Sequence, residues 1–186
     1  NNFFDKEKIK IKKVIINQAN FSLKKDTIKI LNDISNNKFS NRKIKINKSN
    51  IFFKNNSDET ISIVKVYKSE LYFDDKQLLN LFNLRGEIFK VPFIFDLKNT
   101  TDTLENKKFN IAAKSLKLNI FNNATDIKKN LTNGENIISF LNSKIHTKYT
   151  IKEKLINFES GVSKIKNSKI NYKGQIVINP FDLNLN

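Results

Sequence analysis

The chain has 186 residues, of which 34 are basic and 18 acidic, for a net charge of +16. This length suits one ordinary domain and is short for two. With no cysteine and a single histidine, His146, neither disulfide bonds nor ordinary zinc sites can organise the fold. No apolar run approaches the ~20 residues that span a bilayer. Because the chain lacks methionine and ends within the alternating string "FDLNLN", we expect an internal fragment of a longer protein.

The positive charge does not by itself predict a nucleic-acid-binding protein. Lysine, asparagine and isoleucine, the residues of A/T-rich codons, dominate the chain, and the charges are spread along it. Arginine, which nucleic-acid sites favour for bidentate contacts, occurs only as Arg42 and Arg85. We therefore interpret most lysines as solvated strand positions and expect no nucleic-acid partner.

Alternation of apolar and polar residues is the main structural signal along the chain. It occurs at 8–12, 43–47, 91–97, 116–120 and 183–185. A period of two predicts strands with one apolar and one solvated face, as in antiparallel sheets.

Short polar clusters and glycines predict the turns between these strands. They lie at 55–58, Asp74-Asp75, Gly86, 99–102, Asn122-Asn123, Asn133-Gly134 and Gly174. The Asn133-Gly134 pair favours a tight hairpin. Pro92 is expected at a sheet edge or a strand start, because proline has no N–H to donate.

Two segments, 25–37 and 75–83, place apolar residues at helical spacing. The first has Ile30, Leu31 and Ile34 after a possible cap at Asp26, and the second has Leu78, Leu79 and Phe82 after Asp74 or Asp75. The sequence thus predicts a single all-β segment over 1–186, mainly antiparallel. Repeated strand pairs would form an elongated curved sheet or groove of about twelve or more strands, with one or two short helices.

One short template recurs along the chain. Its three clear copies are Lys45-Ile46-x-Lys48-Ser49-x-Ile51-x-Phe53, Lys65-Val66-x-Lys68-Ser69-x-Leu71-x-Phe73 and Lys164-Ile165-x-Asn167-Ser168-x-Ile170-x-Tyr172. A degenerate fourth copy covers 16–23, and a partial fifth lies within 140–149. The pair of polar residues before each serine indicates a bulge or bend. The first two serines are about 20 residues apart, so we predict a repeating unit of two strands.

The strings "KIKINKSNIFFKNNSDETISIVKVYKSELYFDD", "LLNLFNLRGEIFKVPFIFDL" and "INYKGQIVINPFDLNLN" resemble AsmA-like proteins of bacterial envelopes, especially Lys/Asn/Ile-rich alphaproteobacterial versions. Residues 86–93 match the family's G-x-I-F-x-I-P-F strand. The resemblance implies a long apolar β-groove without catalytic residues. It further implies a periplasmic protein, tethered to the inner membrane by a helix outside this chain, that moves phospholipid toward the outer membrane.

Acyl chains would then lie on the apolar strand face, with head groups above a lysine-rich rim. The candidate lipid-facing residues are Ile51, Phe53, Leu71, Phe73, Phe93, Phe95, Ile170 and Tyr172. Each buried CH₂ would contribute ~0.8 kcal/mol. A repeated strand surface is what a conduit requires, because each strand pair offers the same apolar strip.

Catalysis is not expected, and neither a metal nor a cofactor is predicted. The candidate carboxylates Asp58-Glu59, Asp74-Asp75 and Asp102 fall in turn contexts, Glu87 stands alone, and His146 lies in a strand pattern without an acidic cluster near it in sequence. Two alternatives to the conduit stay open. One is a structural or adhesive β-solenoid or sandwich with a closed core, and the other, less favoured, is a basic nucleic-acid-binding domain.

Overall fold

The computed structural model describes residues 11–24, 37–100, 105–128, 130–178 and 181–185. The core of the helix predicted at 25–37 lies outside these residues, as does Asp102. The described strands are β1 (Lys13–Asn17), β2 (Asn20–Lys24), β3 (Lys43–Lys54), β4 (Thr60–Asp74), β5 (Leu79–Ile88), β6 (Val91–Thr100), β7 (Asn106–Ala113), β8 (Leu118–Lys128), β9 (Leu131–Phe140), β10 (Ser143–Lys152), β11 (Leu155–Ile165), β12 (Ser168–Ile178) and β13 (Phe181–Leu185).

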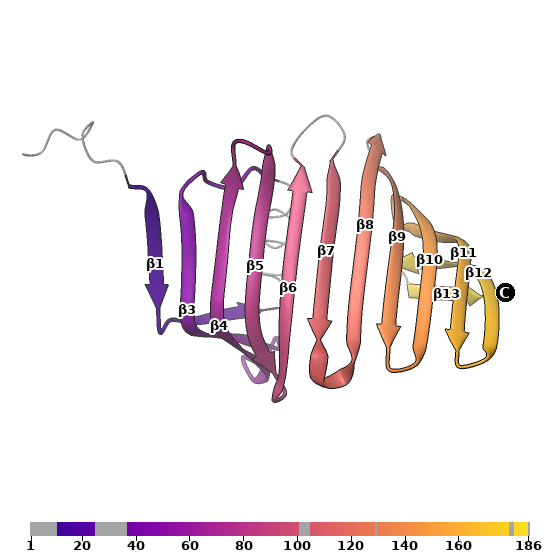
Figure 1. The fold of residues 1–186 in the computed structure, drawn as a ribbon, viewed down its shortest axis with the longest axis horizontal. Coiled ribbons are helices and arrows are strands. Elements are labelled where there is room, and N and C mark those ends of the chain that lie inside the picture. The colour runs from indigo at the N-terminus through magenta and orange to yellow at the C-terminus, as the bar shows by residue number, and fades with distance from the viewer. Residues whose placement is uncertain (1–10, 25–36, 101–104, 129, 179–180, 186) are drawn as a thin grey trace, which may run out of the picture.

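These thirteen strands form one open sheet (Figure 1). From β3 to β13 each strand pairs antiparallel with the next one in the chain. The all-β, mainly antiparallel prediction is therefore confirmed. The exception is the N-terminal end, where β1 and β2 both pair parallel with β3. At the C-terminal end β13 runs across the direction of the strands in front of it (Figure 1).

The helix predicted at 75–83 is wrong. Asp74 does cap the segment, since its Oδ1 accepts hydrogen bonds from the N–H groups of Lys76 (2.9 Å) and Gln77 (3.3 Å). Leu78, however, adopts a left-handed φ of 53°, which reverses the chain, and β5 starts at Leu79. In the described part of the chain the only helical element is the 3-10 turn η2 (Lys114–Leu116).

Two of the predicted polar turns are confirmed, whereas those at Asn122-Asn123 and at the glycines are not, and the turn expected at 99–102 lies partly outside the described residues. The turns at 55–58 and after Asp74 are confirmed, and Pro92 lies at the start of β6 as expected. Gly86, Asn122-Asn123, Asn133-Gly134 and Gly174 all lie inside strands. The turn expected at Asn133-Gly134 occurs instead before Leu131, with Asn130 left-handed (φ 63°).

The four glycines lie in strands and not in turns, and none has a positive φ. Gly134 faces Tyr149 and Gly161 faces Tyr172 in neighbouring strands. A Cβ placed on Gly134 would lie 2.3 Å from the Tyr149 ring, and one on Gly161 would lie 2.1 Å from the Tyr172 ring. Each tyrosine ring therefore lies over a strand position where only glycine, which has no Cβ, leaves room for the ring.

The repeated template marks real structure, but it is not a two-strand unit. Its first two copies occupy the adjacent antiparallel strands β3 and β4, where Ile46 pairs with Ser69 and Ser49 pairs with Val66. The two copies are thus related by a local twofold axis. Their spacing of about 20 residues is one strand and one turn, because β3 and β4 are longer, at 12 and 15 residues, than the usual strand.

The bend predicted within the template occurs in each of the first two copies. Lys48 is left-handed (φ 48°), and the register between β4 and β5 shifts around Tyr67. In the third copy Lys166 (φ 52°), which aligns with Tyr67 and lies one position before the equivalent of Lys48, is in the hairpin turn between β11 and β12. All three copies thus interrupt the regular strand before the serine, but in the first two the interruption lies within a strand and in the third it forms a hairpin turn.

Candidate functional site

One face of the sheet, which we call the inner face, carries a mainly apolar row at right angles to the strands. Each member pairs directly with the next across ten strands, from β3 to β12. In order, the row is Ile46, Ser69, Leu84, Phe95, Ile111, Ile120, Ile138, Ile145, Ser163 and Ile170. Strands lie about 4.8 Å apart, so this isoleucine row is about 43 Å long.

The row is only partly covered by the rest of the chain. Ser69 and Leu84 are buried, but Phe95 and the four isoleucines from Ile111 to Ile145 are half-buried, and Ile170 is 55 % exposed. The chain exposes 13635 Å² in total. A compact monomer of this length would expose about 9,200 Å². In the described part of the chain, the inner face from Ile111 to Ile145 and at Ile170 is therefore left partly open to solvent.

All eight residues predicted to face lipid lie on the inner face, but in two separate places. Six lie in β3, β4 and β6, and the other two, Ile170 and Tyr172, lie at the far end in β12. Phe95 and Ile170 belong to the isoleucine row. Sequence reasoning missed its middle members, from Ile111 to Ile145, because only the pairing register shows that they align.

Phe73 is the one candidate that the chain itself covers. Its side chain is 3 % exposed, and the Lys38 ammonium lies 3.8 Å from the centre of its ring. The covering segment is fixed by Asn80, which is fully buried: its Oδ1 accepts from the Phe39 N–H (2.7 Å), and its Nδ2 donates to the Asn37 carbonyl (2.8 Å). Phe73 is therefore part of the core and is not available to a ligand.

Beside the isoleucine row, the inner face changes from apolar to polar along the sheet. In β5 to β7 the adjacent row consists of Phe82, Leu97 and Phe109, and in β8 to β10 it continues as Asn122, Asn136 and Thr147. The Tyr149 hydroxyl donates to Asn122 Oδ1 (2.8 Å), and the hydroxyls of Tyr172 and Thr147 are hydrogen-bonded to each other. The isoleucine row in β8 to β10 thus has a polar border.

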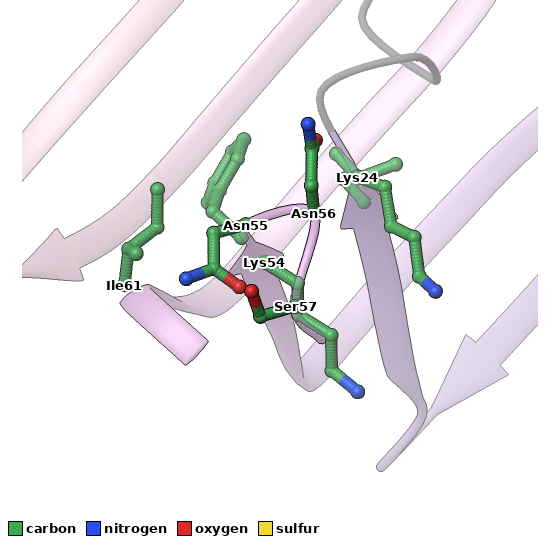
Figure 2. A pocket seen from close by; sticks show the side chains of 8 residues that line it. Lys24, Lys54, Asn55, Asn56, Ser57 and Ile61 are labelled. Carbon is green, nitrogen blue, oxygen red and sulfur yellow. The ribbon is translucent and has the colours of Figure 1, made fainter. Parts of the chain in front are cut away.

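A hollow of about 430 Å³ lies at one end of the inner face, next to the turn between β3 and β4. Leu23, Phe53 and Ile61 give it an apolar lining. Figure 2 shows Lys24 from β2, Lys54 to Ser57 from the end of β3 and its turn, and Ile61 from β4 around it. Both lysines are engaged by Asp58, at 2.8 Å and 3.1 Å, so the hollow offers an apolar surface rather than a site for an anion.

The opposite, outer face carries ion pairs across neighbouring strands. Lys43 and Lys45 both lie 3.2 Å from Glu70. Burial raises the pKa of Glu70, but the hydrogen bonds from these two lysines outweigh it and leave the pKa below its usual value. These contacts join the neighbouring strands β3 and β4 across the outer face.

Glu87 and Asp58, two of the candidate acids from the sequence, are also engaged in structural contacts. Glu87 accepts from the Tyr67 hydroxyl (2.6 Å) and from Lys65 (2.9 Å), which together lower its pKa. Hydrogen bonds from Lys24 and Lys54 lower the pKa of Asp58. His146 lies on the outer face with its Nε2 3.3 Å from Glu135, a partner on β9 that sequence reasoning did not find.

Among the described residues, no group of three His, Asp or Glu side chains lies close enough to hold a metal ion. In the same part of the chain, no helix has the length and hydropathy to cross a bilayer. Comparison with protein-family models, curated proteins and solved structures finds no match. The similarity to AsmA-like proteins therefore rests on the quoted sequence patterns alone.

Proposed function

We propose that this chain binds the acyl chains of phospholipids along the isoleucine row, as a segment of a non-enzymatic, AsmA-like envelope protein. The observation that carries the proposal is the row itself: a strip about 43 Å long that crosses ten strands in register, is apolar except at Ser69 and Ser163, and is half-buried from Phe95 to Ile145. Soluble monomers rarely leave a long contiguous apolar surface without a partner for it.

The open part of the row, from Ile111 to Ile145, is the main binding surface in this proposal. Identical or similar side chains follow one another at the strand spacing, so an acyl chain moving along the row exchanges one contact for an equivalent one. The polar border formed by Asn122, Asn136 and Thr147 confines the hydrocarbon to the row. In the whole protein, this sheet would serve phospholipid transfer through the periplasm, with the inner-membrane anchor outside this chain.

Two neighbouring isoleucines allow a direct test. Ile138 belongs to the isoleucine row, while Ile137 points to the outer face, and both are half-buried. Native mass spectrometry of the purified chain should detect co-bound phospholipid. Ile138→Asn should remove most of the lipid adducts, whereas Ile137→Asn should keep them. A stable wild-type monomer without lipid, or equal adducts on both variants, would overturn the proposal.

One observation favours the structural alternative at the N-terminal end. Asn47 donates to Asn17 Oδ1 (2.9 Å) and Asn50 donates to Asn20 Oδ1 (3.0 Å), so asparagine side chains stack between parallel, in-register strands. Such ladders hold stacked repeats together. The lipid-free monomer described above is the result that would favour this reading.

A further inference from the structure

The long edge of the sheet at the bottom of Figure 1 holds the turn between β3 and β4, with Asp58 and Glu59, and beyond it four further turns in line. They are residues 89–90, 114–117, 141–142 and 166–167, and we call them the basic turn edge. Neighbouring turns are two strands apart, so their spacing is about 10 Å and the whole edge is about 30 Å long. A partner that contacts all four turns must therefore extend over about 30 Å.

The basic turn edge combines lysines with large exposed apolar side chains. Its lysines are Lys90, Lys114, Lys117 and Lys166, and these four turns contain no acidic residue. In the neighbouring turn between β3 and β4, Asp58 is paired with Lys24 and Lys54. Phe89 is 74 %, Leu141 59 % and Leu116 40 % exposed. On the opposite edge, the described turns 75–78 and 153–154 hold two acids and two lysines, so that their charges cancel.

Backbone geometry shows that these apolar side chains do not serve the turns. Phe89 (φ 49°) and Leu141 (φ 52°) occupy left-handed positions, where asparagine and glycine are favoured and large side chains are rare. Neither side chain gains burial in return. A function outside the fold explains why phenylalanine and leucine stand there.

We propose that the basic turn edge docks on an anionic phospholipid bilayer. Lysines alone would suit any polyanion, but the apolar tips need a hydrocarbon layer directly beneath the negative charges, which a bilayer interface provides. Leu116 and Leu141 have no aromatic face on which nucleic-acid bases could stack. Lipid is thus the surface that matches both kinds of side chain.

This edge also runs parallel to the isoleucine row. Ile111, Ile120, Ile138 and Ile145 each stand three residues from a turn of the edge, which is about 10 Å along a strand. A bilayer docked at the edge would lie equally near to all four isoleucines. The docking surface itself does not depend on the proposed acyl-chain binding.

Vesicle co-sedimentation with the purified chain tests the proposal. The chain should bind vesicles that mix phosphatidylcholine and phosphatidylglycerol, bind pure phosphatidylcholine at least tenfold more weakly, and dissociate as salt rises. The double variant F89N/L141N puts a turn-favouring residue at both positions and should keep the fold, as circular dichroism can verify. We expect it to lower the partition coefficient at least tenfold.

Leu78→Asn is the matched control, because Leu78 is also left-handed and 53 % exposed but lies on the opposite edge. It should leave vesicle binding unchanged. K117Q/K166Q gives a second, fold-neutral variant that should weaken binding to anionic vesicles only. Equal binding to both vesicle types, or an equal loss with Leu78→Asn, would overturn the proposal. The proposal would also be overturned if a single-stranded DNA oligonucleotide bound as tightly as vesicles and its affinity were unchanged in F89N/L141N.

The two proposals can fail independently. Ile138→Asn should lose lipid adducts in mass spectrometry yet still sediment with anionic vesicles. F89N/L141N should show the reverse behaviour. Loss of both properties in either variant would contradict the separation of the docking surface from the isoleucine row.

Discussion

The two halves of the sheet share the same alternating strands but cover their inner faces differently. In β3 to β6 the chain buries Val64, Val66 and Leu84 against one another and covers Phe73 with the segment before β3. In β8 to β12 the buried side chains are Asn122 and Thr147, with tyrosine rings lying flat over glycines. An alternating pattern therefore determines which face is apolar, and other residues determine whether that face is closed.

The largest effect should come from the ring contacts of the C-terminal half. In Gly161→Ala the new methyl group would overlap the Tyr172 ring, displace it and break its hydrogen bond with Thr147. We expect a loss of about 2–3 kcal/mol in the free energy of unfolding, measured by urea denaturation. In the double variant G161A/Y172A the two losses should not add, because the overlap is gone. Full additivity would mean that the ring does not hold this half together.

The N-terminal half should depend instead on its buried amide. Asn80→Ala leaves the Phe39 N–H and the Asn37 carbonyl without their partner, so we expect a loss of about 2 kcal/mol. Asn83→Ala on the same strand is the control, since Asn83 is exposed and bonds only to Asp96 in an exposed contact (2.6 Å). It should cost less than about 0.5 kcal/mol. Equal effects would show that the covering segment does not depend on Asn80.

A smaller, pH-dependent effect should appear at the bend between β4 and β5. Hydrogen bonds from Tyr67 and Lys65 lower the pKa of Glu87 below its usual 4.5. This contribution to stability is present above pH 4.5 and is lost as the pH falls through the lowered pKa. Glu87→Gln should therefore flatten part of the decline in unfolding free energy below pH 4.5. Tyr67→Phe should shift that decline toward higher pH, and an unchanged profile in both variants would contradict the assignment.

Much of the fold could be predicted because strand alternation is a local signal. The copy of the template at 16–23 even indicates the correct neighbour, since Ile16 lies beside Ile46 and Phe21 beside Ile51. The helix at 75–83 could not be distinguished from a strand by spacing alone: Leu78 and Phe82, four residues apart, satisfy both periods until the left-handed φ of Leu78 is known.

The candidate site was harder to predict than the fold. Glycine usually indicates a turn, but Gly134 and Gly161 are required by tyrosines on other strands, and no local pattern reveals that contact. The isoleucine row likewise depends on nine pairings, each set by turn length and bulge position. Phe73 looked equivalent to Phe53 in the template, yet the segment that buries it comes from a region with no recognisable pattern.

The parallel pairing at the N-terminal end has a consequence for the integrity of the sheet. Residues 13–24 repeat the sequence pattern of β3 and lie on it with identical positions side by side, including the left-handed Gln18 (φ 56°) and Lys48 (φ 48°). If residues 13–24 were removed, β3 would present an edge with the same bend and the same order of asparagine and apolar side chains. Removal of the edge strands β1 and β2 would thus expose a new edge, on β3, with the same pattern as the edge that was lost.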